Sequence, residues 1–162
     1  MKSISASLLG FVVFILVAVP AMQAIADDAA NEALAKRFYT EFNAGNIDAY
    51  DQFIAADIVD HSAAPGTPSG IDSLKKEMKD FKAAFPDIKL DNQKVLASGE
   101  YVTVVSEASG TNTGPMMGMA ATGKPAKFQT IDVWLVRDGK LAEAWHVEQL
   151  LQMMTQLGAM GK

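Results

Sequence analysis

The chain has 162 residues, no cysteine and a formal net charge of −5 at neutral pH. A chain of this length forms one domain with a sizeable core. The lack of cysteine excludes disulfides, thiol catalysis and iron–sulfur chemistry. The mild acidity and dispersed basic residues give no electrostatic reason to bind nucleic acid or an anionic membrane.

The N-terminus has the pattern of a secretory signal peptide. Lys2 supplies a positive start, and Leu8–Val19 is an apolar run too short to span a bilayer comfortably. Ala24–Ala26 then offers the small-x-small pattern that signal peptidase accepts. We therefore expect residues 1–26 to be a cleaved signal peptide, with an uncleaved anchor as the alternative. Residues 27–162 are then an exported domain, periplasmic or secreted, without stable membrane association.

Helical periodicity dominates the first half of the mature chain. Apolar residues recur at helical spacing over residues 27–44, and a short helix is expected from Asn46. Residues 56–62 are expected to be extended, and residues 63–70 form a loop rich in proline and glycine. Residues 71–85 repeat the helical spacing, which predicts a third helix.

The second half changes to the alternation of strands. Strands are predicted over residues 88–96, 101–108, 127–136 and 140–147, followed by a closing helix over residues 149–157. A long loop rich in glycine, threonine and methionine separates the two strand pairs. Helices followed by strands indicate an α+β fold, in which a curved antiparallel sheet packs against three N-terminal helices. Such an arrangement leaves a cavity between the sheet and the helices.

Short motifs in a fixed order resemble one known family. They are Asp60-His61 before Pro65-Gly66, Phe85-Pro86-Asp87, the segment from Gly110 to Lys124, Asp138-Gly139-Lys140, Glu143-x-Trp145 and Gln156-Leu157-Gly158. This set resembles the SnoaL-like polyketide cyclase and ester cyclase group of the nuclear transport factor two-like superfamily. The resemblance implies a cystatin-like α+β cone, a homodimer, a deep apolar pocket and an acid–base carboxylate near the end of the last strand.

The chain departs from this pattern at the polar positions. His146 stands where many relatives carry an aspartate, and Asp132 stands where some cyclases carry a histidine. Gln149 occupies a position that is often acidic. The resemblance thus leaves two alternatives, an exchanged Asp/His pair or a loss of cyclase chemistry.

The register of the last hairpin decides whether Asp132 and His146 can meet. A two-residue turn at Asp138-Gly139 would place them on opposite faces. A three-residue loop with a bulge would pair Val136 with Lys140 and gather the polar groups on one face. We prefer the second register, which aligns Phe128, Thr130, Asp132, Trp134, Ala142, Ala144, His146 and Glu148.

An aspartate beside an imidazole can fix its tautomer and raise its basicity, which suits proton abstraction next to a carbonyl. We therefore predict Asp132, His146 and Glu148 as catalytic residues. Thr130 and Trp134 are candidates to bind substrate and to donate a hydrogen bond to an enolate oxygen. The alternative is that these are core polar groups, paired only for stability.

The remaining candidates are less central. His61, before the proline- and glycine-rich loop, is expected to bind substrate near the cavity mouth. Met117 and Phe128 are expected to contribute apolar pocket wall, with copper binding by the methionine cluster as the alternative for the loop. The two histidines, at positions 61 and 146, lack the spacing of a zinc motif, so we expect no metal and no cofactor.

Two functions stay open. The first is a cofactor-independent cyclase, isomerase or hydrolase that acts on a small hydrophobic carbonyl compound. The second is a binding protein that holds a small hydrophobic ligand and performs no chemistry. Gln149 favours the second, and the polar face around Asp132 and His146 favours the first.

Overall fold

The computed structural model describes residues 18–160, with side-chain surroundings from residue 27 onward. Most of the apolar run Leu8–Val19 therefore lies outside the described residues. The first helix, α1, begins at Ala18 and ends at Ala44, so it continues across the predicted cleavage point at residue 26. Cleavage itself stays a prediction. None of the helices described is both long and apolar enough to cross a bilayer.

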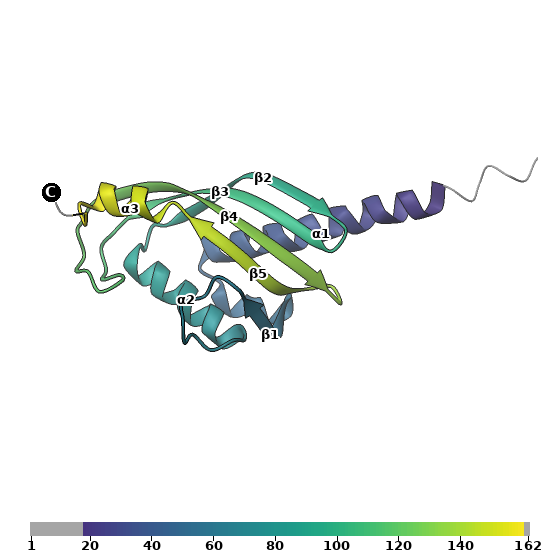
Figure 1. Cartoon of the computed structure of the whole chain (residues 1–162), viewed down its shortest axis with the longest axis horizontal. Helices are drawn as coiled ribbons and strands as arrows, with labels where there is room; N and C mark the ends of the chain where they lie inside the picture. The colour runs from purple at the N-terminus through teal and green to yellow at the C-terminus, as the bar shows by residue number, and fades with distance from the viewer. Residues whose placement is uncertain (1–17, 161–162) are drawn as a thin grey trace, which may run out of the picture.

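The order of elements agrees with the predicted α+β fold. After α1 come the 3₁₀ helix η1 (Ile47–Gln52), β1 (Ile54–Asp60), α2 (Ile71–Ala84), β2 (Lys89–Ser98), β3 (Tyr101–Thr111), β4 (Pro125–Arg137), β5 (Lys140–Glu148) and α3 (Leu150–Leu157). Figure 1 shows α1 lying along the sheet and extending beyond it at one end, with α3 at the other end. The three predicted N-terminal helices and the closing helix are thus confirmed.

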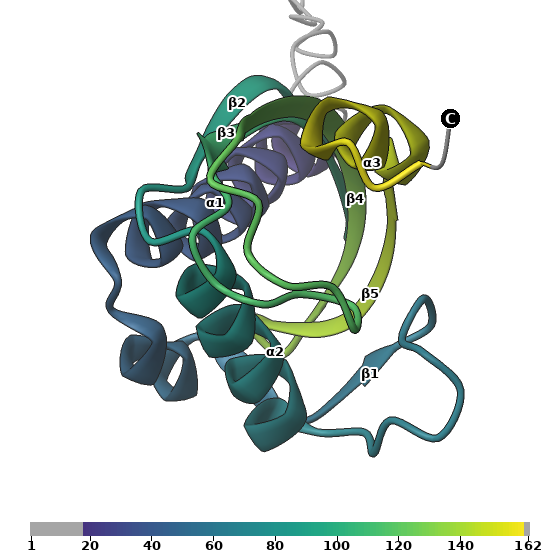
Figure 2. The same ribbon diagram turned by 90° about the vertical axis from the view of Figure 1, so that its left-hand side faces the viewer.

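The sheet curls strongly, and the helices close its open side. Figure 2 shows β2 to β5 forming an arc, with α1 and α2 on its concave side. Aromatic residues fill the space between these layers, since Tyr39, Phe42, Tyr50, Phe53 and Phe85 are all 2 % exposed or less. Phe38 joins them by stacking on Tyr50 at a centroid distance of 4.9 Å. Burial of these rings is the main driving force for holding the helices on the sheet.

The sheet has the order β1-β5-β4-β3-β2, and it is mixed rather than purely antiparallel. β1, which was expected only as an extended piece, pairs in parallel with β5 and aligns Asp60 with Ala144. The backbone N–H of His61 also donates to the carbonyl of Ala144 at 2.9 Å. β1 therefore carries residues from the first half of the chain to the edge of the last strand.

The last hairpin corrects the predicted loop. Arg137 pairs with Lys140, so the turn has two residues, and the predicted pairing of Val136 with Lys140 is wrong. Asp138 and Gly139 both have positive φ, 51° and 70°. This backbone suits a tight hairpin because its twist matches that of the strands. The register then shifts between Leu135 and Val136, so one bulge residue in β5 returns Asp132 and His146 to a shared face, as the three-residue loop was expected to do.

The long loop between β3 and β4 is anchored at its base. The buried side chain of Asn112 donates to the carbonyls of Ala84 and Gly114 and accepts from the backbone N–H of Thr122. At its tip, Met116 bridges Met119 in a small antiparallel turn. The loop is therefore held to the C-terminal end of α2 rather than hanging free.

Candidate active site

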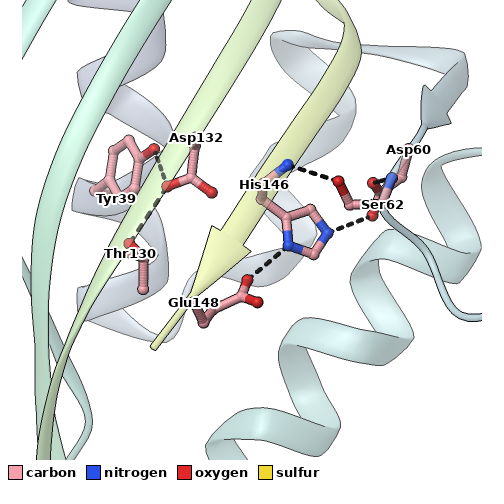
Figure 3. Close-up of polar contacts among 7 residues, drawn as sticks. All are labelled: Tyr39, Asp60, Ser62, Thr130, Asp132, His146 and Glu148. Atoms are coloured by element: carbon pink, nitrogen blue, oxygen red, sulfur yellow. Dashed lines mark hydrogen bonds and ion pairs between the residues drawn. The ribbon is translucent and has the colours of Figure 1, made fainter. Parts of the chain in front are cut away.

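Asp132 and His146 lie on the same face of the sheet and are direct cross-strand partners. The predicted shared face is therefore confirmed, although the turn that produces it differs. The backbone N–H of His146 donates to Ser62 on the far side of β5. Asp132 and His146 therefore form a non-hydrogen-bonded cross-strand pair. In such a pair the two side chains lie closer together than in a hydrogen-bonded pair. Figure 3 shows both side chains on the helix-covered side of the sheet.

The hydrogen-bond partners of His146 are two other carboxylates. Its Nε2 lies 3.0 Å from Oδ2 of Asp60, and its Nδ1 lies 2.6 Å from Oε1 of Glu148. A neutral imidazole has one N–H and one lone pair, so it cannot donate to two carboxylates at once. The hydrogen bonds from His146 to Asp60 and Glu148 raise the pKa of His146 to about 10, against its partial burial. His146 is therefore an imidazolium at neutral pH.

Asp132 has a different set of partners. Tyr39, from α1, donates its O–H to Oδ2 of Asp132 at 2.9 Å, and Thr130 lies 3.5 Å from the same oxygen. Trp134 donates its Nε1–H to the oxygen of Tyr39 at 3.1 Å. Indole nitrogen can only donate, so the tyrosine oxygen accepts there and its own hydrogen points to Asp132. The second oxygen of Asp132, Oδ1, is therefore the one left to take a proton.

Burial changes the acidity of Asp132. Removal from water raises its pKa to about 6, although the Tyr39 hydrogen bond and the positive charge of His146 act in the opposite direction. Burial and the nearby Asp132 carboxylate also raise the pKa of Tyr39 well above its ordinary value, so the tyrosine stays protonated. The site thus combines a carboxylate that titrates near neutral pH with a fixed cation on the next strand.

Six of the eight predicted site residues, including Asp132 and His146, lie on this face. Phe128, Thr130 and Trp134 are buried on the inner side of β4, and Glu148 binds His146. Asp132 and His146, however, do not form the expected direct hydrogen-bonded pair, because each has other partners nearby.

Two predicted substrate-binding residues lie elsewhere. His61 stacks on Trp145 with ring planes 6° apart and contacts Glu143 at 2.8 Å, on the outer face of the sheet. Met117 is 65 % exposed at the tip of the long loop, with a positive φ of 50°. Neither residue contacts the cluster, so we leave both out of the proposed site.

Sequence reasoning missed Asp60 and Tyr39. Asp60 was noted only as part of a family motif, and Tyr39 only falls within the helix predicted over residues 27–44. Each is more than 80 residues from its partner, since 86 residues separate Asp60 from His146 and 93 separate Tyr39 from Asp132. Asp60 follows the apolar pair Ile58-Val59 and stands beside a loop, and this was the one local signal.

The cavity beside the cluster is small. It has a volume of about 30 Å³ and lies between α2 and the loop after β1, bordered by Asp60, Glu77, Leu74 and Ala144. This volume holds a water molecule rather than a drug-sized ligand. The deep pocket implied by the family resemblance is therefore not open next to Asp60.

A wider, open groove of about 500 Å³ lies at the other end of the sheet, where Lys89, Lys127 and Gln156 line it. It contains no histidine and no buried acid, so it offers no acid–base pair. Within residues 18–160, no three acidic or histidine side chains are arranged to hold a metal ion.

The comparisons with known proteins agree with this geometry. Residues 33–157 match the family described as SnoaL-like polyketide cyclase, so the chain belongs to that family. No curated protein matches the chain. Solved structures with the same fold are numerous, and TsrD from Streptomyces laurentii is similar with a TM-score of 0.77 and 25 % identity, over 83 % of this chain and 98 % of that one.

Two other solved structures are similar at slightly higher identity. IdmH from Streptomyces antibioticus has 29 % identity and a TM-score of 0.70, over 79 % of this chain and 98 % of its own. A protein from Bacillus cereus, assigned as a polyketide cyclase, has 30 % identity and a TM-score of 0.68, over 79 % of this chain and 80 % of its own. The family points to cyclase- or isomerase-type chemistry that needs no cofactor.

Proposed function

We propose that this protein catalyses acid–base chemistry on a small hydrophobic carbonyl compound, with Asp132 as the general base. The observation that carries the proposal is the carboxylate of Asp132, which is largely removed from water, accepts a hydrogen bond from Tyr39 and has a pKa raised to about 6, close to neutral pH. A base is most effective when its pKa lies near the working pH, and such a group contributes about 10²–10⁴-fold to a rate. Phe128 and Trp134, which are buried on the same face, make the surroundings of Asp132 apolar, and this suits a hydrophobic substrate.

The proposed reaction is an aldol-type ring closure. Oδ1 of Asp132 takes a proton from the carbon next to a carbonyl, and the electron pair of that C–H bond moves to the carbonyl oxygen. The positive charge of His146, on the adjacent strand, stabilises the resulting enolate. The enolate carbon then forms a bond to a second carbonyl of the same substrate, and the new alkoxide recovers the proton from Asp132. Protons and electrons therefore balance without a cofactor.

This assignment exchanges the roles expected from the sequence. The expected base was His146, with Asp132 orienting it. His146 is instead held as a cation between Asp60 and Glu148, and a cation cannot accept a proton. Asp132 is the group with a free oxygen and a pKa in the useful range. The exchanged Asp/His pair therefore remains compatible with cyclase chemistry.

Proton abstraction can be tested without the natural substrate. We propose to follow hydrogen–deuterium exchange next to the carbonyl of 2-tetralone by NMR, with the wild type and the Asp132→Asn variant. The matched control is Asp57→Asn, which removes an exposed acid on β1. The proposal predicts accelerated exchange that is lost in Asp132→Asn and retained in Asp57→Asn. Equal exchange in the wild type and Asp132→Asn contradicts it.

The second candidate is a binding protein without chemistry. The small cavity beside Asp60 and the complete pairing of both nitrogens of His146 favour it, because a resting enzyme usually offers a free donor to its substrate. Mass spectrometry of small molecules that co-purify with the protein separates the two. An unchanged hydrophobic molecule in stoichiometric amount, together with no catalysed exchange, supports the binding protein.

We also propose that the protein is a homodimer through the outer face of the sheet. One mostly apolar row crosses four strands there, since Leu96, Thr103, Val133 and Trp145 are aligned in successive pairs and only Thr103 among them is polar. Leu96 is 61 % exposed, which is unusual for a large apolar side chain in a row of this kind. Sedimentation of the wild type and of Val133→Glu tests this: the proposal predicts a dimer that becomes a monomer, and a monomeric wild type contradicts it.

Export is the remaining proposal. It rests on the charged start, the apolar run and the small-x-small pattern that end at residue 26. N-terminal sequencing of the mature protein tests it. A first residue of Asp27 supports export with cleavage, and an intact N-terminus in the cell interior contradicts it.

A further inference from the structure

The two carboxylate partners of His146 are held very differently. Asp60 is fixed from two sides: its Oδ1 accepts the backbone N–H of Ser62 at 2.8 Å, and its Oδ2 contacts Nε2 of His146. Ser62 in turn accepts the backbone N–H of His146 at 2.9 Å. Asp60 and Ser62 together hold both the ring and the backbone of His146. Hydrogen bonds from His146 and Ser62 keep the pKa of Asp60 below its ordinary value, despite burial.

Glu148 is held only by His146. It is the last residue of β5, and within the described residues its carboxylate has no hydrogen bond other than that with Nδ1. Its side chain is 30 % exposed, compared with 17 % for Asp60. A long side chain with one partner and access to water can move away at low cost, because water replaces the lost hydrogen bond.

The two ring nitrogens also face different surroundings. Figure 3 shows Nε2 of His146 turned toward β1 and Asp60, and Nδ1 turned toward Glu148 on the side where Asp132 lies. A substrate held against Asp132 is therefore next to Nδ1 and not next to Nε2. The charged groups that face the ring are Asp60 from β1, Glu77 from α2, Asp132 from β4 and Glu148 from β5.

We propose that Asp60 is a positioning residue that orients His146 through Nε2, and that Glu148 is a displaceable partner whose departure frees Nδ1–H for the substrate carbonyl oxygen. This inference rests on the proposed function and adds the donor that the enolate oxygen requires. As Asp132 takes the proton from carbon, negative charge develops on the carbonyl oxygen, and Nδ1–H donates to it. His146 gives up no proton, and Asp60 keeps it charged after Glu148 has left.

The first test needs no ligand and uses the wild-type chain. NMR of the two ring N–H groups of His146 measures how fast each exchanges with water. Because Nε2–H is bonded to the fixed carboxylate, we expect it to exchange about tenfold more slowly than Nδ1–H, or slower still. Equal rates, or a slower Nδ1–H, overturn the inference.

The second test compares matched variants. Asp60→Asn and Glu148→Gln each remove one charge from His146, whereas Glu143→Gln removes the acid that contacts His61 and serves as the control. We expect Asp60→Asn to lower the ring pKa of His146 by about 1–3, Glu148→Gln to lower it less, and Glu143→Gln to leave it unchanged. A larger effect of Glu148→Gln overturns the inference.

The pH profile of tetralone exchange gives a readout that a purely structural role would not change. In Asp60→Asn, activity is expected to fall at high pH as His146 loses its proton, and this fall is expected to be absent from the wild type below pH 8. A wild-type-like profile in Asp60→Asn contradicts the positioning role. The proposed function fails separately, through undiminished exchange in Asp132→Asn.

Discussion

The two histidines of this chain lie on opposite faces of the same sheet and both contact a carboxylate, yet their surroundings differ. His146, on the inner face, is 20 % exposed and contacts two carboxylates, those of Asp60 and Glu148. His61, on the outer face, is 38 % exposed, and its single partner Glu143 is shared with Arg137 at 2.8 Å. The comparison teaches that the same histidine–carboxylate contact can occur in very different surroundings. The two carboxylate partners are what hold His146 as a cation at neutral pH, although its partial burial lowers its pKa.

The largest expected difference between the faces is catalytic. Asp132→Asn removes the inner base, and we expect the rate of catalysed exchange to fall by about 10²–10⁴-fold. Glu143→Gln, which removes an acid of the outer face, is expected to leave that rate unchanged. Exchange rates with 2-tetralone measure both. A comparable loss in Glu143→Gln would erase the distinction between the two faces.

The next difference concerns stability. His146→Gln leaves Asp60 and Glu148 without their cation, so we expect it to destabilise the fold by about 1–3 kcal/mol near pH 6. The folded-state pKa of about 10 lies above the ordinary value of 6.5. The stabilisation is therefore complete below pH 6.5, declines as the pH rises and is lost above about 10. Urea unfolding at pH 6, 8 and 10 should show that the difference in unfolding free energy between the variant and the wild type shrinks as the pH rises. A difference that stays constant would contradict this.

Asp132→Asn should also change stability, in the opposite direction. The pKa of Asp132 is raised from 3.8 to about 6, so its ionised form is disfavoured in the folded protein. The stability associated with the neutral form is present below pH 3.8 and is lost as the pH rises through 6. Because asparagine stays neutral, the variant should be more stable than the wild type by about 1–3 kcal/mol at pH 7.5. The same unfolding experiment measures this gain in stability. A loss of stability at that pH would argue against an ionised Asp132 that is disfavoured in the folded protein.

The smallest expected effect belongs to the outer pair. His61→Gln removes an exposed contact that water and salt screen, so its unfolding midpoint should stay close to that of the wild type. Melting curves at 0.05 M and 1 M salt serve as the check. A loss of stability comparable with that of His146→Gln would show that the two sites are equivalent after all.

The sequence predicts the fold better than the site. Alternation along β4 and β5 predicts the two strands, and the Asp138-Gly139 pair marks the hairpin, but the shared face of Asp132 and His146 depends on the bulge in β5. The bulge in β5 is not visible in the sequence, because any small residue there can absorb the extra position. The partners of the two groups come from β1 and α1, and contacts across more than 80 residues depend on tertiary packing rather than local pattern.

His61 shows the opposite error. Its place before a proline- and glycine-rich loop suggested the mouth of a cavity, and Asp60 beside it received no role. Because adjacent residues of a strand point to opposite faces, Asp60 turns toward His146 while His61 turns toward Trp145. Choosing the neighbouring residue at the end of β1 is therefore enough to exchange a site residue for a surface residue.

The most direct measurement is one NMR titration that follows the Asp132 carboxyl carbon and the His146 ring together from pH 4 to 9. The account predicts that the carboxyl group titrates near pH 6 while the imidazole keeps both protons throughout. A ring that loses its proton below pH 7, beside a carboxylate already ionised at pH 4.5, would make His146 the base and contradict the account.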